Sequence, residues 1–127
     1  MKEPLLLDTS VLYWIVTSSS RLSQPARRAI ERGSLVVSVA SYWEITIKSG
    51  RGGLIIPNPL LWWEKAIDQT SAHVLPIWTN HVTALQTLPD YHRDPFDRII
   101  AAQAISEGYI LVTADAVLQK YPVRFIW

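Results

Sequence analysis

Pro4-Leu5-Leu6-Leu7-Asp8 is the stretch that decides the fold of this 127-residue chain. Three consecutive leucines leave no position for a polar side chain, which is the pattern of a strand buried on both faces inside a parallel sheet. The acidic residue follows at the point where such a strand ends and a helix begins. The stretch therefore predicts an inner β-strand with a carboxylate at its carboxyl end.

The rest of the chain alternates between strand-like and helical segments. Short apolar runs predict further strands over residues 35–38, 73–77, 109–112 and 123–127. Turn signals and helical spacing predict helices that begin near residue 11 and cover 25–32, 39–48, 60–71, 80–87, 95–107 and 115–119. This alternation predicts a single α/β domain over residues 1–127, with a mostly parallel central sheet between two helical layers. Ligands of such sheets bind at the carboxyl ends of the strands.

Composition excludes several classes of protein. Hydrophobic residues make up 49% and charged residues 18%, which excludes intrinsic disorder. The net charge of +1 means that any contact with nucleic acid must come from a local basic patch. The absence of cysteine excludes disulfides, thiolate zinc sites and cysteine catalysis, and it fits a reducing compartment. We find no apolar run near the ~20 residues of a membrane span and no signal peptide, so we expect a cytoplasmic protein.

Four acidic residues are expected at one rim of the predicted sheet. Asp8 and Asp115 follow two of the strands, Glu44 lies in the helix after a third, and Asp97 lies in the first turn of the helix that begins after Asp94. Carboxylates that lie close together raise one another's pKa, and a hard divalent cation removes this repulsion. Oxygen ligands favour Mg²⁺ or Mn²⁺ over Zn²⁺. The acidic residues therefore predict a metal site.

Each acidic residue also has a simpler interpretation, which the sequence leaves open. Asp8 and Asp115 suit helix caps, and Asp94 suits a cap more than a site. Glu44 fits a capping box with Ser41, and it also forms an i,i+4 pair with Lys48.

Histidines and basic residues give weaker signals. The three histidines lack metal-ligand spacing: we expect His73 in a strand and His81 on the surface, whereas His92, beside the acidic motif, is a candidate for supporting the site or the substrate. Four basic residues near the expected rim are candidates for phosphate contacts, namely Lys48, Arg51, Arg93 and Arg98.

Four segments, in this order, resemble the PIN domain, and in particular the VapC-type ribonuclease toxins of bacterial toxin–antitoxin pairs. The segments are Leu7-Asp8-Thr9-Ser10, Ser38-Val39-Ala40-Ser41-Tyr42-Trp43-Glu44-Ile45, His92-Arg93-Asp94-Pro95-Phe96-Asp97-Arg98 and Leu111-Val112-Thr113-Ala114-Asp115. By motif position, Asp8, Glu44, Asp97 and Asp115 match the four acidic residues of the family. Asp94 matches an acidic residue of its D-P-F-D variant, Thr113 matches its small hydroxyl residue, and Thr9 is a further accessory candidate.

The resemblance implies a three-layer PIN-like fold and hydrolysis of RNA by one or two Mg²⁺ or Mn²⁺ ions, which orient the scissile phosphate and activate water. It further implies products with a 5′-phosphate and a 3′-hydroxyl, a homodimer, and a small antitoxin protein as partner. The RNA substrate is expected to be single-stranded or looped, where its phosphates are accessible.

Two other functions remain open at this stage. A phosphatase or phosphotransferase would use Asp8 as nucleophile, although the D-x-D motif typical of such enzymes has Ser10 in its last position here. A non-catalytic binding module would use the acidic residues as caps only and would have no metal-dependent activity.

The apolar content also predicts a partner surface. Residues 11–16 are apolar all round their helix, which is more than one buried stripe requires. We expect their outer part, together with one of Trp62 and Trp63, to form a patch that a partner covers. An antitoxin helix is expected to lie in such a groove and to place a basic side chain near the acidic rim. The alternative is that a neighbouring helix covers this helix.

Overall fold

Five parallel strands form the central sheet of the protein in the computed structural model, which describes residues 2–51 and 56–127. The strand order is β3-β2-β1-β4-β5, so the leucine strand lies at the centre. The strands are β1 (Pro4–Leu7), β2 (Ser34–Ser38), β3 (His73–Leu75), β4 (Ile110–Val112) and β5 (Phe125–Ile126). The predicted α/β fold with a parallel sheet is confirmed.

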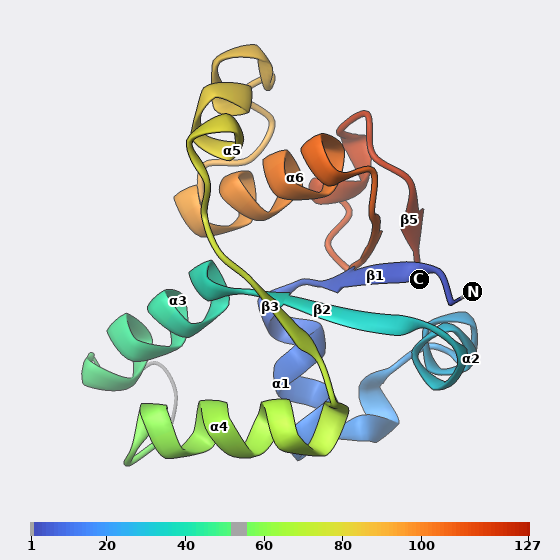
Figure 1. Cartoon of the computed structure of the whole chain (residues 1–127), viewed down its shortest axis with the longest axis vertical. Helices are drawn as coiled ribbons and strands as arrows, with labels where there is room; N and C mark the ends of the chain where they lie inside the picture. Colours follow the sequence, from blue (N-terminus) through green and yellow to red (C-terminus); the bar gives the residue numbers. More distant parts are fainter. Residues whose placement is uncertain (1, 52–55) are drawn as a thin grey trace.

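Helices cover both faces of the sheet (Figure 1). On one face lie α5 (Thr79–Ala84) and α6 (Pro95–Glu107), and on the other lie α1 (Thr9–Thr17), α2 (Gln24–Arg32) and α4 (Pro59–Thr70). α3 (Val39–Gly50) continues from the carboxyl end of β2 and packs against both α4 and α6. The described residues also form three short 3-10 turns: η1 (Ser19–Arg21), η2 (Leu85–Thr87) and η3 (Leu118–Lys120). No helix in the described ranges is long and apolar enough to cross a membrane.

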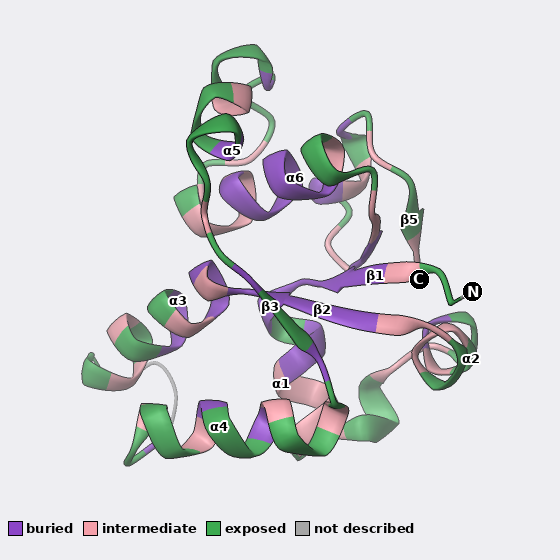
Figure 2. Cartoon of the chain, in the orientation of Figure 1, coloured by how far each residue is buried: buried purple, intermediate pink, exposed green. Residues whose placement is uncertain are grey.

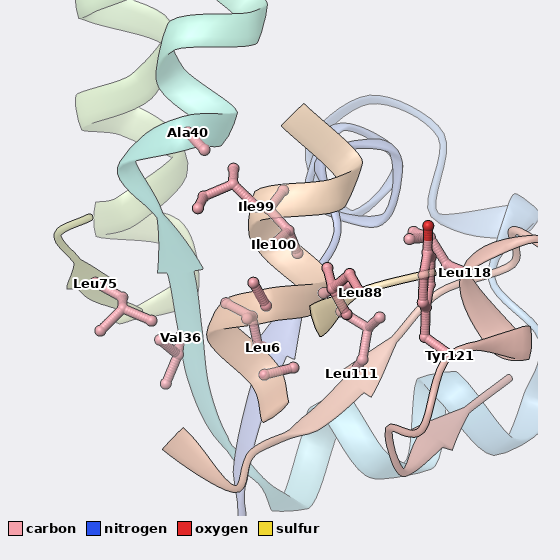
Figure 3. Packing of buried hydrophobic residues seen from close by; sticks show 13 residues of the cluster. Leu6, Val36, Ala40, Leu75, Leu88, Ile99, Ile100, Leu111, Leu118 and Tyr121 are labelled. Atoms are coloured by element: carbon pink, nitrogen blue, oxygen red, sulfur yellow. The ribbon is translucent and has the colours of Figure 1, made fainter. Parts of the chain in front are cut away.

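The leucines of β1 divide between two apolar cores. Leu6 points to the face covered by α6 and packs with Ile100 and Leu111 (Figure 3). Leu5 and Leu7 point to the other face, toward α1 and α4. All three are at most 2% exposed, and Figure 2 shows β1 and the middle of α6 as buried. This two-sided burial explains why the strand contains no polar residue.

Side-chain caps fix where the helices begin at the carboxyl end of the sheet. Asp8 accepts a hydrogen bond from the backbone N–H of Val11, and Ser38 accepts one from Ala40. Asp94 accepts from Phe96 and Asp97, with Pro95 in the first helical position. The boundary expected at Asp94-Pro95 is therefore confirmed.

Two helices expected from the sequence differ from the structure. Residues 115–119 do not form an α-helix, because Asp115 caps only a tight turn, through the backbone N–H groups of Val117 and Leu118, that leads into η3. The helix expected over 80–87 ends as α5 at Ala84 and continues as η2.

The prediction that His81 lies on the surface is wrong. Its ring is fully buried between α5 and α6. Nε2 donates a hydrogen bond to Glu107 over 2.8 Å, and Nδ1 accepts one from the backbone N–H of Trp78 over 3.0 Å. Local sequence does not reveal this burial, because a polar ring can be buried only when both nitrogens have partners, and one of these partners, Glu107, is distant in the chain.

Candidate functional site

A pocket of about 250 Å³ opens at the carboxyl end of the sheet, between α1, α3 and the first turn of α6. Four carboxylates from four separate segments line it, namely those of Asp8, Glu44, Asp97 and Asp115. The structure thus brings together all four acidic residues expected at this rim.

Asp8 is at once a helix cap and the deepest carboxylate of the pocket. Its side chain is 4% exposed, and its second oxygen accepts a hydrogen bond from the Thr113 hydroxyl. The pKa of Asp8 is raised to about 6, chiefly by burial and to a smaller extent by the charges of Asp115 and Glu44, although the hydrogen bonds from Thr113 and Val11 act in the opposite direction. The cap interpretation and the site interpretation therefore apply to the same side chain.

Asp97 lies in a similarly unfavourable place for a negative charge. Burial is the largest cause of the raised pKa of Asp97, and the neighbouring carboxylates of Asp94 and Glu44 raise this pKa as well. Together they raise the pKa of Asp97 to about 7, although His92 acts in the opposite direction. A group with this pKa is only partly ionised near neutrality unless a cation stabilises its charge.

Glu44 contributes an oxygen that has no partner. Its side chain is buried, and Oε2 is paired with the ammonium of Lys48 on the next turn. Within the described residues, Oε1 accepts no hydrogen bond. The capping-box interpretation of Glu44 is wrong, because Ser38 caps α3 while the Ser41 hydroxyl bonds to Thr9 over 2.8 Å. The i,i+4 pair with Lys48 is present.

His92 joins the site from the loop that precedes α6. Its Nε2 lies 2.8 Å from an oxygen of Asp115 and 3.3 Å from one of Asp97. Its Nδ1 accepts a hydrogen bond from the backbone N–H of Asp94, so the ring hydrogen is assigned to Nε2, which donates toward the two carboxylates. Partial burial alone would raise the pKa of Asp115, but the hydrogen bonds from His92 and Val117 outweigh it and lower that pKa.

The remaining candidates fall into two groups. Thr113 is buried; its hydroxyl bonds to Asp8 and accepts from the backbone N–H of Asp115, so it ties two of the pocket acids together. Of the four basic candidates, only Lys48 lines the pocket. Arg51 and Arg93 are exposed and do not line it, and the guanidinium of Arg98 contacts Pro89, Asp90 and Tyr121.

The contacts of His92 support a larger role than its position in the sequence indicates, and no sequence motif points to Trp14 or Arg21. His92 and two of the acids place ligand atoms within 4.8 Å of one another, although the spacing in the chain matches no metal motif. Trp14 lines the pocket, and the guanidinium of Arg21 lies over the Trp14 ring. Only tertiary structure shows these placements, because the loop before α6 folds back toward Asp115 and the η1 turn folds back over α1.

The donor set of the pocket fits a hard divalent cation. Its ligand atoms are carboxylate oxygens, one of them is buried without a partner, and two of the acids have raised pKa values. A cation supplies the charge that this arrangement lacks.

Comparisons with known proteins agree with this geometry. The family model for the PIN domain matches residues 5–123. Ribonuclease VapC22 of Mycobacterium tuberculosis is 32% identical over 121 residues, which is 92% of this chain and 91% of the relative. Among solved structures, VapBC2 from Rickettsia felis bound to a DNA fragment from its promoter superposes with a TM-score of 0.69 at 12% identity, covering 96% of each chain. FitAcB from Neisseria gonorrhoeae superposes with a TM-score of 0.55 at 16% identity, covering 95% of each chain.

Burial of the Asp97 carboxylate, together with the neighbouring negative charges, predicts that Asp97→Asn stabilises the metal-free protein at neutral pH. The pKa of Asp97 is higher in the folded protein than in the unfolded chain, so the fold loses stability as pH rises from about 4 to about 7. Asparagine removes this loss, and each pKa unit corresponds to about 1.4 kcal/mol, so we expect a gain of more than about 1 kcal/mol. Urea unfolding in EDTA measures it.

The control is Asp68→Asn, which removes a carboxylate from the exposed side of α4. The gain of Asp97→Asn over this control is expected to shrink as pH falls and to disappear below about pH 3, where the carboxyl of Asp97 is protonated in the folded protein and in the unfolded chain. An Asp97→Asn protein that is no more stable than the Asp68→Asn protein at neutral pH would contradict the proposed free-energy cost of ionising Asp97 in the folded protein.

Proposed function

The chain belongs to the PIN-domain family and, within it, to the VapC ribonucleases of toxin–antitoxin systems, and we propose that its acidic pocket hydrolyses RNA phosphodiester bonds with Mg²⁺ or Mn²⁺. The convergence of four carboxylates in one pocket carries the proposal, together with the unpartnered oxygen of Glu44. These features favour a nuclease over a phosphatase with Asp8 as nucleophile, because Asp8 is buried with both oxygens hydrogen-bonded. They also favour it over a binding module whose acids are only caps.

Asp8 and Asp97 would hold the cation, supported by Glu44 and Asp115. When bound, the cation supplies charge neutralisation of the scissile phosphate and lowers the pKa of an attacking water. The two raised pKa values mean that a cation must displace protons from these carboxyls, so affinity rises with pH through about 6 to 7.

The other polar side chains orient these ligands. Thr113 donates its hydroxyl hydrogen to Asp8 and accepts from the backbone at Asp115, which fixes the two carboxylates relative to each other. His92 donates from Nε2 to Asp115 and lies beside Asp97, and we assign it a positioning role. Supporting hydrogen bonds of this kind determine how well ligand atoms are oriented. Asp94 caps α6 and so directs Asp97 into the pocket.

The proposed contacts with the RNA backbone come from basic residues, of which Lys48 lines the pocket. The ammonium of Lys48 lies at the pocket wall, where it is half exposed beside Glu44. Exposed Arg51 and Arg93 extend the positive charge, whereas Arg98 holds the loop before α6. Single-stranded RNA suits such a site, because its phosphates are accessible and its binding is electrostatic. The proposed products have a 5′-phosphate and a 3′-hydroxyl, and we propose that the chain acts in the cytoplasm.

We expect Mg²⁺-dependent cleavage of single-stranded RNA that Asp8→Asn reduces by about 100-fold or more, because the residue supplies a ligand for the ion that activates water. Electrophoresis of a labelled RNA of mixed sequence measures the rate. The Asp68→Asn protein, which lacks a carboxylate outside the pocket, is expected to match the wild type. Cleavage that continues in EDTA, or at the wild-type rate in Asp8→Asn, would contradict the proposal.

An apolar surface on α4 supports the proposed partners, a homodimer and a small antitoxin. Leu60 and Leu61 are 52% and 46% exposed, and Trp62 beside them is half-buried, whereas Trp63 is buried. Leu61 and Trp62 line a cavity of about 270 Å³. The relation to VapC ribonucleases motivates an antitoxin helix as the occupant, and the solved structures of VapBC2 and FitAB share the fold of this chain. Part of the expected patch is covered within the chain, since Tyr13 of α1 stacks on Trp62.

Leu61→Lys is expected to weaken binding of the antitoxin by about tenfold or more, because it places a charge in an apolar contact, while RNA cleavage stays unchanged. Affinity for the protein encoded beside this chain's gene measures the effect. Val82→Lys is the matched control, because Val82 is an exposed apolar residue on α5, away from the α4 surface. Equal affinities for the two variants would place the antitoxin elsewhere.

Light scattering of the free chain is expected to give about twice the monomer mass, and a monomer would contradict the homodimer.

A further inference from the structure

A second cavity of about 270 Å³ adjoins the acidic pocket along α1. The two cavities share five lining residues, including Trp14, Glu44 and Lys48. The second cavity adds Tyr13 and Arg21, which the acidic pocket lacks. A groove therefore runs from the carboxylates past Lys48 to the outer half of α1.

Arg21 gives this groove a positive charge that no carboxylate neutralises. The described residues include all eleven acidic side chains, and none of them lies within ion-pair distance of Arg21. The η1 turn that carries it is held by a 2.7 Å hydrogen bond from Arg27 to the backbone carbonyl of Ser19. The guanidinium lies 4.5 Å from the centre of the Trp14 ring. The structure thus holds a cation in place while its charge remains available to a ligand.

The aromatic side chains of the groove are supported from behind. Tyr13 stacks on Trp62 with the ring centres 5.9 Å apart, and Trp14 packs on Trp127 at 5.8 Å. Both remain partly exposed and line the cavity. Fixed aromatic rings and arginine planes are the surfaces on which unpaired nucleobases stack.

We propose that this cavity is a nucleotide subsite, in which Arg21 with Tyr13 and Trp14 binds the nucleotide next to the scissile phosphate. The inference rests on the proposed function, because it places the scissile phosphate in the acidic pocket. Lys48 lies in both cavities and contacts the phosphate between them. Direct continuity with the carboxylates favours RNA over a protein segment as the occupant, since the adjoining cavity offers a direct path to a strand whose phosphate lies in the acidic pocket.

Binding of a fluorescein-labelled single-stranded RNA of mixed sequence tests the subsite, in the Asp8→Asn background with Mg²⁺ present so that the RNA stays intact. Arg21→Ala is expected to weaken binding about five- to tenfold, which matches the loss of one base stack or phosphate contact. The slope of log affinity against log salt is expected to fall by about 0.7, because one phosphate contact is lost. Arg21→Lys keeps the charge, so it is expected to retain the slope while losing part of the affinity.

Arg28→Ala is the matched control: it removes an equal charge from an exposed site on α2, outside both cavities. In proteins that retain Asp8, Arg21→Ala is expected to raise KM for RNA while kcat stays near the wild-type value, and Arg28→Ala is expected to change neither.

Equal binding and salt slopes for Arg21→Ala and Arg28→Ala would overturn the inference, and continued cleavage by the protein with Asp8 would show that the proposed function still stands. Loss of antitoxin affinity in Arg21→Ala without any change in RNA binding would also overturn it and assign the cavity to a protein partner. A wild-type protein that neither binds nor cleaves RNA would contradict the proposed function, and the subsite with it.

Discussion

Burial of β1 on both faces places a carboxylate where water cannot easily reach it, and the rest of the site depends on this constraint. The strand has to be apolar because helices cover both sides of it, and the chain leaves it at Asp8 to begin α1. Ionising Asp8 in this position costs free energy, which hydrogen bonds from Val11 and Thr113 offset only in part. The additional negative charges nearby increase the cost. The proposed divalent cation would remove this cost, and the position of the central strand and the proposed chemistry of the site would then follow from one arrangement.

The same local rules that begin the helices also assemble the pocket. Asp8 and Asp115 cap their turns with one carboxylate oxygen and turn the other toward Thr113 or His92. Asp94 caps α6 and thereby fixes the first turn, from which Asp97 reaches the pocket. For Asp8 and Asp115, the structural and functional interpretations are therefore not alternatives. Parallel strands bring such caps together because their carboxyl ends share one edge of the sheet.

The strand positions and the acids Asp8, Asp97 and Asp115 could be predicted because each depends on a local pattern: an apolar run, a cap, or a proline in the first helical position. Glu44 has no such marker and could be placed only by the helix that follows β2. Side-chain positions that depend on contacts with residues distant in the chain could not be predicted from the sequence. His81 was expected on the surface, yet Glu107, 26 residues away, and the backbone of α5 satisfy its buried ring. His92 reaches Asp115 across 23 residues. Arg21 meets Trp14 only because η1 folds back over α1. After Asp115 the chain forms a tight turn and η3 in place of the expected helix.

The central claim is that the pocket carboxylates are arranged around a divalent cation. Anomalous diffraction from crystals soaked in Mn²⁺ tests it most directly, because it locates the ion independently of any activity. The account predicts a peak in the pocket with oxygens of Asp8 and Asp97 as ligands, and its loss in crystals of the Asp97→Asn protein. A pocket without manganese at saturating concentration, or an ion held elsewhere on the chain without these two residues, would contradict it.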